Sequence, residues 1–299
     1  GYTYPYIDQD LLNQVLPYLS SVSNFTYGFT ANGDLITLDD VGLLINANAA
    51  GAAPIMVLSP LDLEGHFDSQ LIVDVLQNPE AANNLITNTV STAVNKGYAG
   101  VDLDFEYIPR AQRETYVEFA AAMANRLHQQ GMTLNIALPP MVADDQPGLL
   151  YEGIDYAGLG RVADTVLLMT YEWGYAYGPP MAVAPLPEVR RVAEYALTEI
   201  PREKILLGIP NYGYDWTLPY VSGSRARTIG NQEAVDLAAQ YGAAISFDEN
   251  AMSPYFYYTT PEGVEHVVWF EDVRSIDAKL GLVEELGLRG AGYWTVMRP

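Results

Sequence analysis

The stretch Gly100-Val101-Asp102-Leu103-Asp104-Phe105-Glu106-Tyr107 decides how this chain is interpreted. Three carboxylates stand at alternate positions, and the residues between them are apolar or aromatic. Side chains of a strand point to opposite faces with a period of two, so we expect Asp102, Asp104 and Glu106 on one face. A solvated edge strand is the alternative, but such a strand rarely carries three neighbouring acids opposite a face fit for a core. The pattern therefore predicts a buried cluster of carboxyl groups.

Apolar strands and amphipathic helices alternate on both sides of this stretch. Strands are predicted at 1–7, 22–29, 53–59, 100–107, 133–138, 163–171, 204–212 and 291–296. Helices are predicted at 8–19, 38–48, 69–95 with a break near Pro79, 109–130, 186–198 and 272–286, with one short helix before residue 161. Eight strand–helix units favour a (β/α)8 TIM barrel over a doubly wound sheet. The acidic strand also favours the barrel, whose active sites lie at the C-terminal ends of the strands.

The segment 213–270 interrupts the alternation. It holds a predicted helix near 231–241 and short strands that include 255–259 and 265–269. We interpret it as a small α+β insertion after the seventh strand. Residues 1–299 are then expected to form one catalytic barrel domain that includes the insertion.

Composition excludes several classes of function. The formal net charge of -22 disfavours nucleic acid and anionic membranes, which both need a basic surface. No apolar run is long enough to span a membrane. Cysteine is absent, which removes disulfides, thiolate nucleophiles and cysteine metal sites. The start, Gly-Tyr-Thr-Tyr, has neither Met nor a signal-like segment, so we expect a trimmed piece of a longer protein.

The three acids predict acid–base chemistry. Neighbours on one strand face are roughly 7 Å apart, so they cannot all ionise cheaply and at least one pKa should rise. Glu106, nearest the strand end, is the candidate general acid, Asp104 its tuning partner and Asp102 the deeper support. A site for Mg²⁺ or Ca²⁺ is the competing interpretation. The histidines at 66, 128 and 266 fit no ligand spacing.

Aromatic residues recur where the predicted strands end. Such rings suit the stacking of sugars in a cleft, although core packing uses them too. The sequence has no G-x-G-x-x-G after a strand, no P-loop and no G-x-S-x-G elbow. The aromatics are Tyr171, Trp173, Tyr212, Tyr214, Trp216, Trp269, Tyr293 and Trp294.

These motifs resemble a known family. Gly100–Glu106 is similar to the D-G-x-D-x-D-x-E signature of glycoside hydrolase family 18, the chitinase-like barrels. Met169–Glu172 resembles the family's M-x-Y-D on the sixth strand, and Gly208–Gly213 its G-x-P-x-Y-G on the seventh. Trp294 occupies the position of the tryptophan that lies at the bottom of the cleft in the family. Gly213–Phe270 resembles the insertion that many members carry.

The chain departs from the family pattern at three places. Ala99 replaces the first Asp of the signature, and Glu172 replaces the Asp after Tyr171. Ser59 matches the serine of the third strand, but Pro60-Leu61 replaces the usual Gly-Gly. None of these changes removes the acid Glu106.

Two longer stretches narrow the resemblance. Phe105–Pro109 and Met169–Pro185 are similar to the spore-cortex-lytic N-acetylglucosaminidases of endospore-forming bacteria. Those enzymes often carry N-terminal LysM modules that bind peptidoglycan, and this chain has none. Their absence agrees with the trimmed start.

The resemblance implies substrate-assisted retention, an exception to the two-carboxylate scheme of glycosidases. Glu106 would protonate the glycosidic oxygen, and the 2-acetamido carbonyl of the substrate would attack the anomeric carbon. Asp104 would orient the acetamido N–H, Tyr171 would hydrogen-bond its carbonyl oxygen, and Asp102 would support Asp104. The expected sugar contacts are Trp294, Glu172, Trp173, Tyr212, Asn211 and Ser59.

We therefore expect a retaining β-N-acetylglucosaminidase that needs no metal or cofactor. Its expected partner is a polysaccharide that contains N-acetylglucosamine, in peptidoglycan and specifically in spore cortex fragments. Chitin oligomers are the alternative substrate, and a non-catalytic sugar-binding barrel and metal-dependent phosphoryl transfer are the alternative functions. An extracellular or spore-associated location in a bacterium and a monomeric state are expected.

Overall fold

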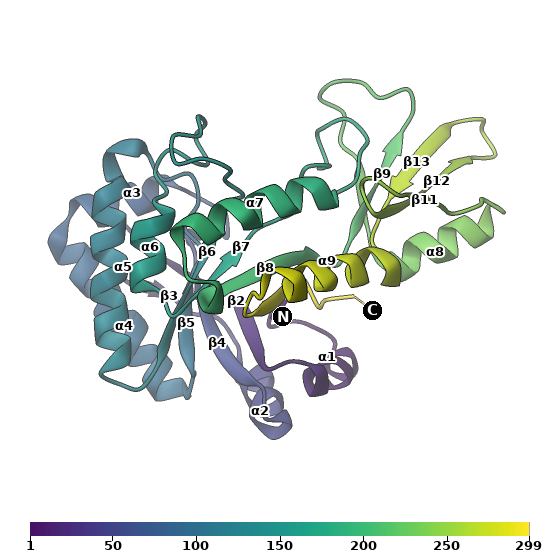
Figure 1. Ribbon diagram of the computed structural model, residues 1–299. Helices are drawn as coiled ribbons and strands as arrows, with labels where there is room; N and C mark the ends of the chain where they lie inside the picture. Colours follow the sequence, from purple (N-terminus) through teal and green to yellow (C-terminus); the bar gives the residue numbers. More distant parts are fainter. Residues whose placement is uncertain (299) are drawn as a thin grey trace.

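Eight parallel strands close into a barrel in the computed structural model, which describes residues 1–298 (Figure 1). The strand β1 pairs with both β2 and β14, and this double pairing closes the ring. The predicted (β/α)8 barrel is confirmed, with the acidic strand β5 as its fourth member. The barrel strands are β1 (Tyr2–Thr3), β2 (Ser21–Phe29), β4 (Ala53–Leu58), β5 (Gly100–Leu103), β6 (Thr133–Leu138), β7 (Thr165–Leu168), β8 (Ile205–Pro210) and β14 (Gly290–Trp294); β3 (Leu35–Ile36) pairs antiparallel with β2.

Helices connect the strands and cover the outside of the barrel (Figure 1). The predicted break near Pro79 is confirmed: α3 ends at Gln77, and α4 starts at Pro79 with Asn78 as its N-cap. Proline suits this first position because the N–H it lacks has no partner inside the helix. The helices are α1 (Gln9–Val15), α2 (Val41–Ala50), α3 (Gln70–Gln77), α4 (Pro79–Lys96), α5 (Arg113–His128), α6 (Tyr156–Val162), α7 (Leu186–Glu199), α8 (Asn231–Gln240) and α9 (Val273–Leu286), with 3₁₀ turns η1 (Leu16–Tyr18), η2 (Arg110–Gln112) and η3 (Arg202–Lys204).

The predicted insertion is a second, antiparallel sheet that follows β8 and lies to the right of the barrel in Figure 1. Its strand order is β10-β9-β13-β12-β11. The helix α8 packs on one face through Ala234 and Ala238, which contact a core that includes Phe256 and Val268. The strands are β9 (Gly213–Thr217), β10 (Arg227–Ile229), β11 (Ser246–Asp248), β12 (Ser253–Thr259) and β13 (Glu265–Trp269).

A buried ion pair lies where the insertion returns to the barrel. Lys279 of α9 places its Nζ 3.0 Å from Oε2 of Glu271, and both side chains are fully buried. The backbone N–H of Glu271 donates to Oδ1 of Asn231, at the start of α8. The amide of Asn231 in turn donates to Oδ1 of Asn211, 3.0 Å away at the end of β8. A chain of polar contacts thus joins the insertion to the rim of the barrel.

The acidic strand is shorter than the alternation predicts. Its last pairing is Leu103 with Leu58, and the N–H of Asp104 makes one further bond to the Leu58 carbonyl. The chain then leaves the barrel wall, and Tyr107 adopts a left-handed backbone with φ of 58°. The alternation predicts Tyr107 on the apolar face with Val101, Leu103 and Phe105; this prediction is wrong, because Tyr107 is 52% exposed. Glu106 therefore lies beyond the paired part of the strand, at the rim of the barrel.

Within residues 1–298, no helix combines the length and the apolar character that crossing a bilayer would require.

Candidate active site

A hollow of about 410 Å³ lies at the C-terminal ends of the barrel strands. We call it the acidic hollow, because carboxyl groups from the acidic strand and from the segment after β7 reach it. Aromatic side chains make up much of the remaining wall, as in sugar-binding clefts. The lining residues are Tyr2, Tyr4, Phe25, Phe67, Asp104, Glu106, Tyr107, Ala137, Leu167, Met169, Tyr171, Glu172, Tyr212 and Trp294.

Asp102 lies below the acidic hollow, inside the barrel. Its side chain is fully buried, and its Oδ2 accepts a hydrogen bond from the Tyr2 hydroxyl. Burial raises the pKa of Asp102 to about 6, although hydrogen bonds from Tyr2 and Asn135 act in the opposite direction. The sequence analysis placed Asp102 as a support for Asp104; in the structure, its hydrogen-bonded partner is Tyr2, on the neighbouring first strand.

Asp104 and Glu106 form the upper part of the acidic ladder. Asp104 is 7% exposed, and Glu106 is partly buried at the rim. Burial raises the pKa of Asp104 well above its usual range, and the charges of Glu106 and Asp102 raise it further. Burial also raises the pKa of Glu106, and a hydrogen-bonding interaction with Asp104 offsets part of this rise. Burial therefore favours the protonated form of each carboxyl group, and a charge on one opposes ionisation of the other.

One oxygen of this pair is available to a ligand. Oδ1 of Asp104 is buried and has no hydrogen-bond partner within residues 1–298. A buried polar atom without a partner costs about 1–3 kcal/mol. A ligand N–H that reaches Asp104 would remove that cost.

Tyr171 faces the same carboxyl groups from the segment after β7. Burial raises the pKa of its phenol well above the usual range, and the charges of Asp104 and Glu106 add to the effect. The phenol therefore stays neutral and can donate a hydrogen bond. Thr170 turns away and donates from Oγ1 to the Gly208 carbonyl, 2.7 Å away. A Cβ at position 208 would stand 2.2 Å from the Leu168 carbonyl oxygen, so this close approach requires glycine.

Glu172 accepts hydrogen bonds from two tyrosines where the chain enters the insertion, Tyr212 just before β9 and Tyr214 within it. Its Oε1 accepts hydrogen bonds from Tyr212 and from Tyr214, the latter at 2.8 Å. Desolvation of the carboxyl group raises the Glu172 pKa, and the two phenols offset part of that rise. The backbone of Glu172 is left-handed, with φ of 73°, which is uncommon for a residue with a side chain. This conformation aims a carboxylate at the hollow, and its Oε2 is not used in these bonds.

Trp294 ends β14 and stands among aromatic residues that sequence reasoning missed. Its ring lies 4.8 Å from that of Phe25 and 5.7 Å from that of Tyr2, centroid to centroid. Tyr4 makes an edge contact at 6.2 Å. The alternation of Tyr2 and Tyr4 on the first strand was the only signal in the sequence for this wall.

A second hollow of about 460 Å³ continues the cleft toward the insertion. It shares four lining residues with the acidic hollow, so the two form one groove. Its own walls come from the start of the chain, the insertion and the segment after Trp294. The shared residues are Tyr4, Glu172, Tyr212 and Trp294; the others are Tyr6, Asn211, Tyr214, Thr228, Thr295, Met297 and Arg298.

Two of the expected sugar contacts lie outside both hollows. Ser59 is fully buried, and its hydroxyl bonds to the hydroxyl of Thr26 on the neighbouring strand β2. Trp173 packs against the barrel core, and its backbone N–H donates to the Val183 carbonyl. Both side chains therefore pack against neighbouring residues, and neither lines the two hollows.

The structure offers no support for the competing metal-site interpretation. Among residues 1–298, no group of three or more His, Asp or Glu side chains is arranged to hold a metal ion.

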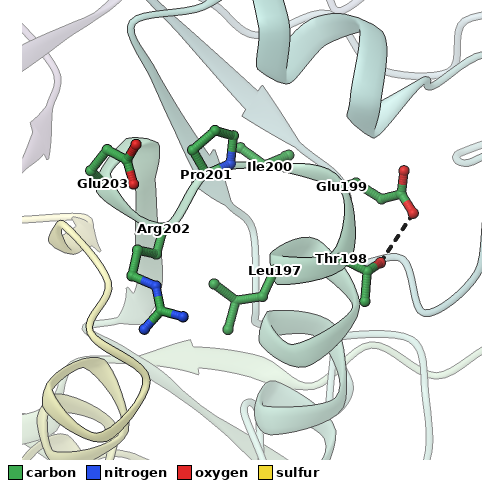
Figure 2. A pocket seen from close by; sticks show the side chains of 7 residues that line it. All are labelled: Leu197, Thr198, Glu199, Ile200, Pro201, Arg202 and Glu203. Carbon is green, nitrogen blue, oxygen red and sulfur yellow. Dashed lines mark hydrogen bonds between the residues drawn. The ribbon is translucent and has the colours of Figure 1, made fainter.

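Another surface hollow, of about 370 Å³, lies where α7 runs into η3 and is lined by residues 197–203 (Figure 2). It precedes β8 and so lies at the N-terminal face of the barrel, away from the carboxyl pair.

A (β/α)8 barrel with a buried pair of carboxyl groups in an aromatic cleft at its C-terminal rim has the architecture of a glycoside hydrolase. The chain belongs to Glycosyl hydrolases family 18, whose sequence profile matches residues 61–298. It is 39% identical to the cortical fragment-lytic enzyme of Bacillus subtilis over 287 residues, 96% of this chain and 66% of that protein.

Solved structures show the same likeness. The spore cortex-lytic enzyme SleL of Bacillus megaterium QM B1551 has a TM-score of 0.95 and 37% identity, over 100% of this chain and 70% of that one. A chitinase from Chromobacterium violaceum has a TM-score of 0.91 and 25% identity, over 99% and 93% of the two chains. The chain thus spans about two thirds of the length of its Bacillus relatives.

Proposed function

We propose that this glycoside hydrolase is a retaining, substrate-assisted β-N-acetylglucosaminidase of peptidoglycan, with spore cortex fragments as its substrate. The observation that carries the proposal is the buried pair Asp104 and Glu106, whose pKa values are raised by burial, beside the neutral phenol of Tyr171. A carboxylic acid that stays protonated near neutral pH is what a general acid requires.

In the first step, Glu106 donates its proton to the glycosidic oxygen as the bond to the anomeric carbon breaks. The carbonyl oxygen of the 2-acetamido group attacks that carbon and gives an oxazolinium ion. Asp104 accepts the acetamido N–H at its unpartnered Oδ1 and stabilises the positive charge that develops. Tyr171 donates its hydroxyl to the same acetamido group and holds the attacking oxygen in place.

In the second step, the Glu106 carboxylate removes a proton from water, and the water oxygen attacks the anomeric carbon. The acetamido group is restored, and the product keeps the β configuration after two inversions. Trp294 is the stacking surface for the sugar, while Glu172 and Tyr212 face its hydroxyl groups. The mechanism requires an N-acetylated sugar at the point of cleavage.

The names of the Bacillus relatives support spore cortex as the substrate and a spore-associated location in a bacterium. Chitin oligosaccharides are the second candidate, favoured by the likeness to a chitinase and by an aromatic hollow suited to uncharged sugars. We further propose that residues 1–299 act as one catalytic domain and as a monomer.

The test compares wild type with Glu106→Gln and Asp104→Asn on peptidoglycan fragments and on chitin oligomers. Glu106→Gln should lose a factor of about 10²–10⁴ in kcat, the usual share of general acid–base catalysis, and Asp104→Asn a factor of about 10²–10³, the usual share of one electrostatic contact to the transition state. Glu118→Gln, an exposed change on α5, is the matched control and should keep the wild-type rate. Near-normal turnover by Glu106→Gln would refute the assignment, and tight binding without turnover by wild type would indicate a sugar-binding barrel instead.

A further inference from the structure

Charge is distributed unevenly along the cleft. The acidic hollow is lined by the carboxyl groups of Asp104, Glu106 and Glu172, and within residues 1–298 no lysine, arginine or histidine lines it. The second hollow shares only Glu172 among these carboxyl groups and adds a cation, Arg298. A sugar that carries a carboxylate would be repelled at the first position and attracted at the second.

The backbone that carries Arg298 is held by the side chain of Asn211. Nδ2 of Asn211 donates to the carbonyls of Thr295 at 3.1 Å and Arg298 at 3.2 Å. Its Oδ1 accepts from Asn231 at 3.0 Å, and its own N–H donates to the Trp294 carbonyl at 2.8 Å. Asn211 was expected as a sugar contact; its amide instead fixes the segment between Trp294 and Arg298.

The guanidinium group of Arg298 keeps its donors available. Among residues 1–298, its nearest carboxylate is that of Glu233, 3.9 Å from Nη1, which is too far for a hydrogen bond. Glu233 is already paired with Arg227, at 2.6 Å. Within residues 1–298 the Arg298 side chain makes no hydrogen bond, and it is 46% exposed. A planar fork of free N–H groups matches the geometry of a carboxylate.

We propose that the second hollow binds the carboxylate-bearing sugar next to the N-acetylglucosamine at the cleavage position, with Arg298 as the carboxylate ligand. The inference rests on the proposed function and deepens it. In alternating peptidoglycan glycan freed of its stem peptides, both neighbours of each N-acetylglucosamine carry a 3-O-lactyl group with a free carboxylate, whichever direction the chain takes through the groove. In chitin, neither neighbour does, so Arg298 separates the two substrate classes.

The test uses two matched substrates: peptide-free peptidoglycan oligosaccharides with free lactyl carboxylates, and the same oligosaccharides converted to neutral methyl amides. The readout is the ratio of kcat/KM on the charged substrate to kcat/KM on the neutral one, so a general effect of a substitution on folding cancels. Arg298→Gln should lower this ratio about tenfold, as expected for the loss of one charge-assisted pair. Arg298→Lys should restore part of it. The wild-type ratio should also fall at high salt, because the site is partly exposed.

Arg191→Gln is the matched control, since it removes an exposed arginine from α7, on the outside of the barrel, and should leave the ratio at the wild-type value. An unchanged ratio in Arg298→Gln would overturn the inference and leave the proposed function standing. If wild type cleaves neither the charged nor the neutral oligosaccharide, nor chitin oligomers, the proposed function itself fails.

Discussion

Replacing Lys279 with methionine should destabilise the junction between the insertion and the barrel by an amount that depends on pH. Methionine keeps most of the side-chain volume but leaves Glu271 buried without its cation. Removing one partner of a buried pair costs about 3–5 kcal/mol. Protonation of Glu271 sets a ceiling on that loss, because the neutral acid no longer needs a cation.

The ceiling follows from the ordinary pKa of the glutamate, 4.5. Keeping the carboxyl protonated at pH 7 costs about 3.4 kcal/mol, at about 1.36 kcal/mol for each pH unit above that value. At pH 5 the same cost is about 0.7 kcal/mol. Burial already raises the Glu271 pKa in the presence of Lys279, which makes protonation the easier route once the lysine is gone.

The assay is urea unfolding of wild type and Lys279→Met at pH 7 and at pH 5. We expect a loss in the free energy of unfolding of about 3 kcal/mol at pH 7 and about 1 kcal/mol at pH 5. The double variant Lys279→Met/Glu271→Gln is the control, and its stability relative to wild type should not fall between pH 5 and pH 7, because it leaves no buried carboxylate without a cation. A loss of equal size at both pH values would refute the reasoning.

Three further outcomes are expected. Asp102→Asn removes an acid whose pKa in the folded protein is about 6, above the usual 3.8. The folded protein binds this proton more tightly than the unfolded chain does, so the stability of the wild type falls as pH rises from about 4 to about 6. The variant should therefore gain up to about 3 kcal/mol relative to wild type between pH 4 and pH 7 in urea unfolding, and a constant difference would contradict this. Asn211→Ala removes three side-chain hydrogen bonds and should lose about 2–4 kcal/mol of stability. It should also raise KM more than it lowers kcat. An unchanged KM would show that substrate binding does not depend on these bonds to the segment after Trp294. Dialysis against EDTA should leave the hydrolysis rate unchanged, and loss of activity with recovery on Mg²⁺ addition would restore the metal-dependent interpretation.

The barrel could be predicted from the sequence because each strand is a local pattern. The eight predicted strands correspond to β1, β2, β4, β5, β6, β7, β8 and β14, and the break at Pro79 follows from the chemistry of proline. The end of β5 could not be predicted in the same way. Alternation continues to Tyr107, but pairing stops at Leu103, which lies opposite Leu58, the last residue of the neighbouring strand β4. A strand's end depends on its neighbours as much as on its own residues.

The same limit applies to the site. Asp104, Glu106 and Tyr171 follow a short-range pattern and lie together as expected. Tyr2, Tyr4 and Phe25 reach the hollow only because β1 and β2 close the ring beside β14, a contact between the two ends of the chain. Ser59 and Trp173 carry residue types suited to sugar binding, but their neighbours bury or cover them.

The measurement that tests the central claim most directly is proton NMR of the reducing end released in the first seconds of digestion of peptidoglycan oligosaccharides. The account predicts that N-acetylglucosamine forms the new reducing end and appears first as the β anomer, with the α anomer arising later by mutarotation. Initial release of the α anomer would contradict retention by the acetamido group, and a new reducing end on the lactyl-bearing sugar would contradict the cleavage position.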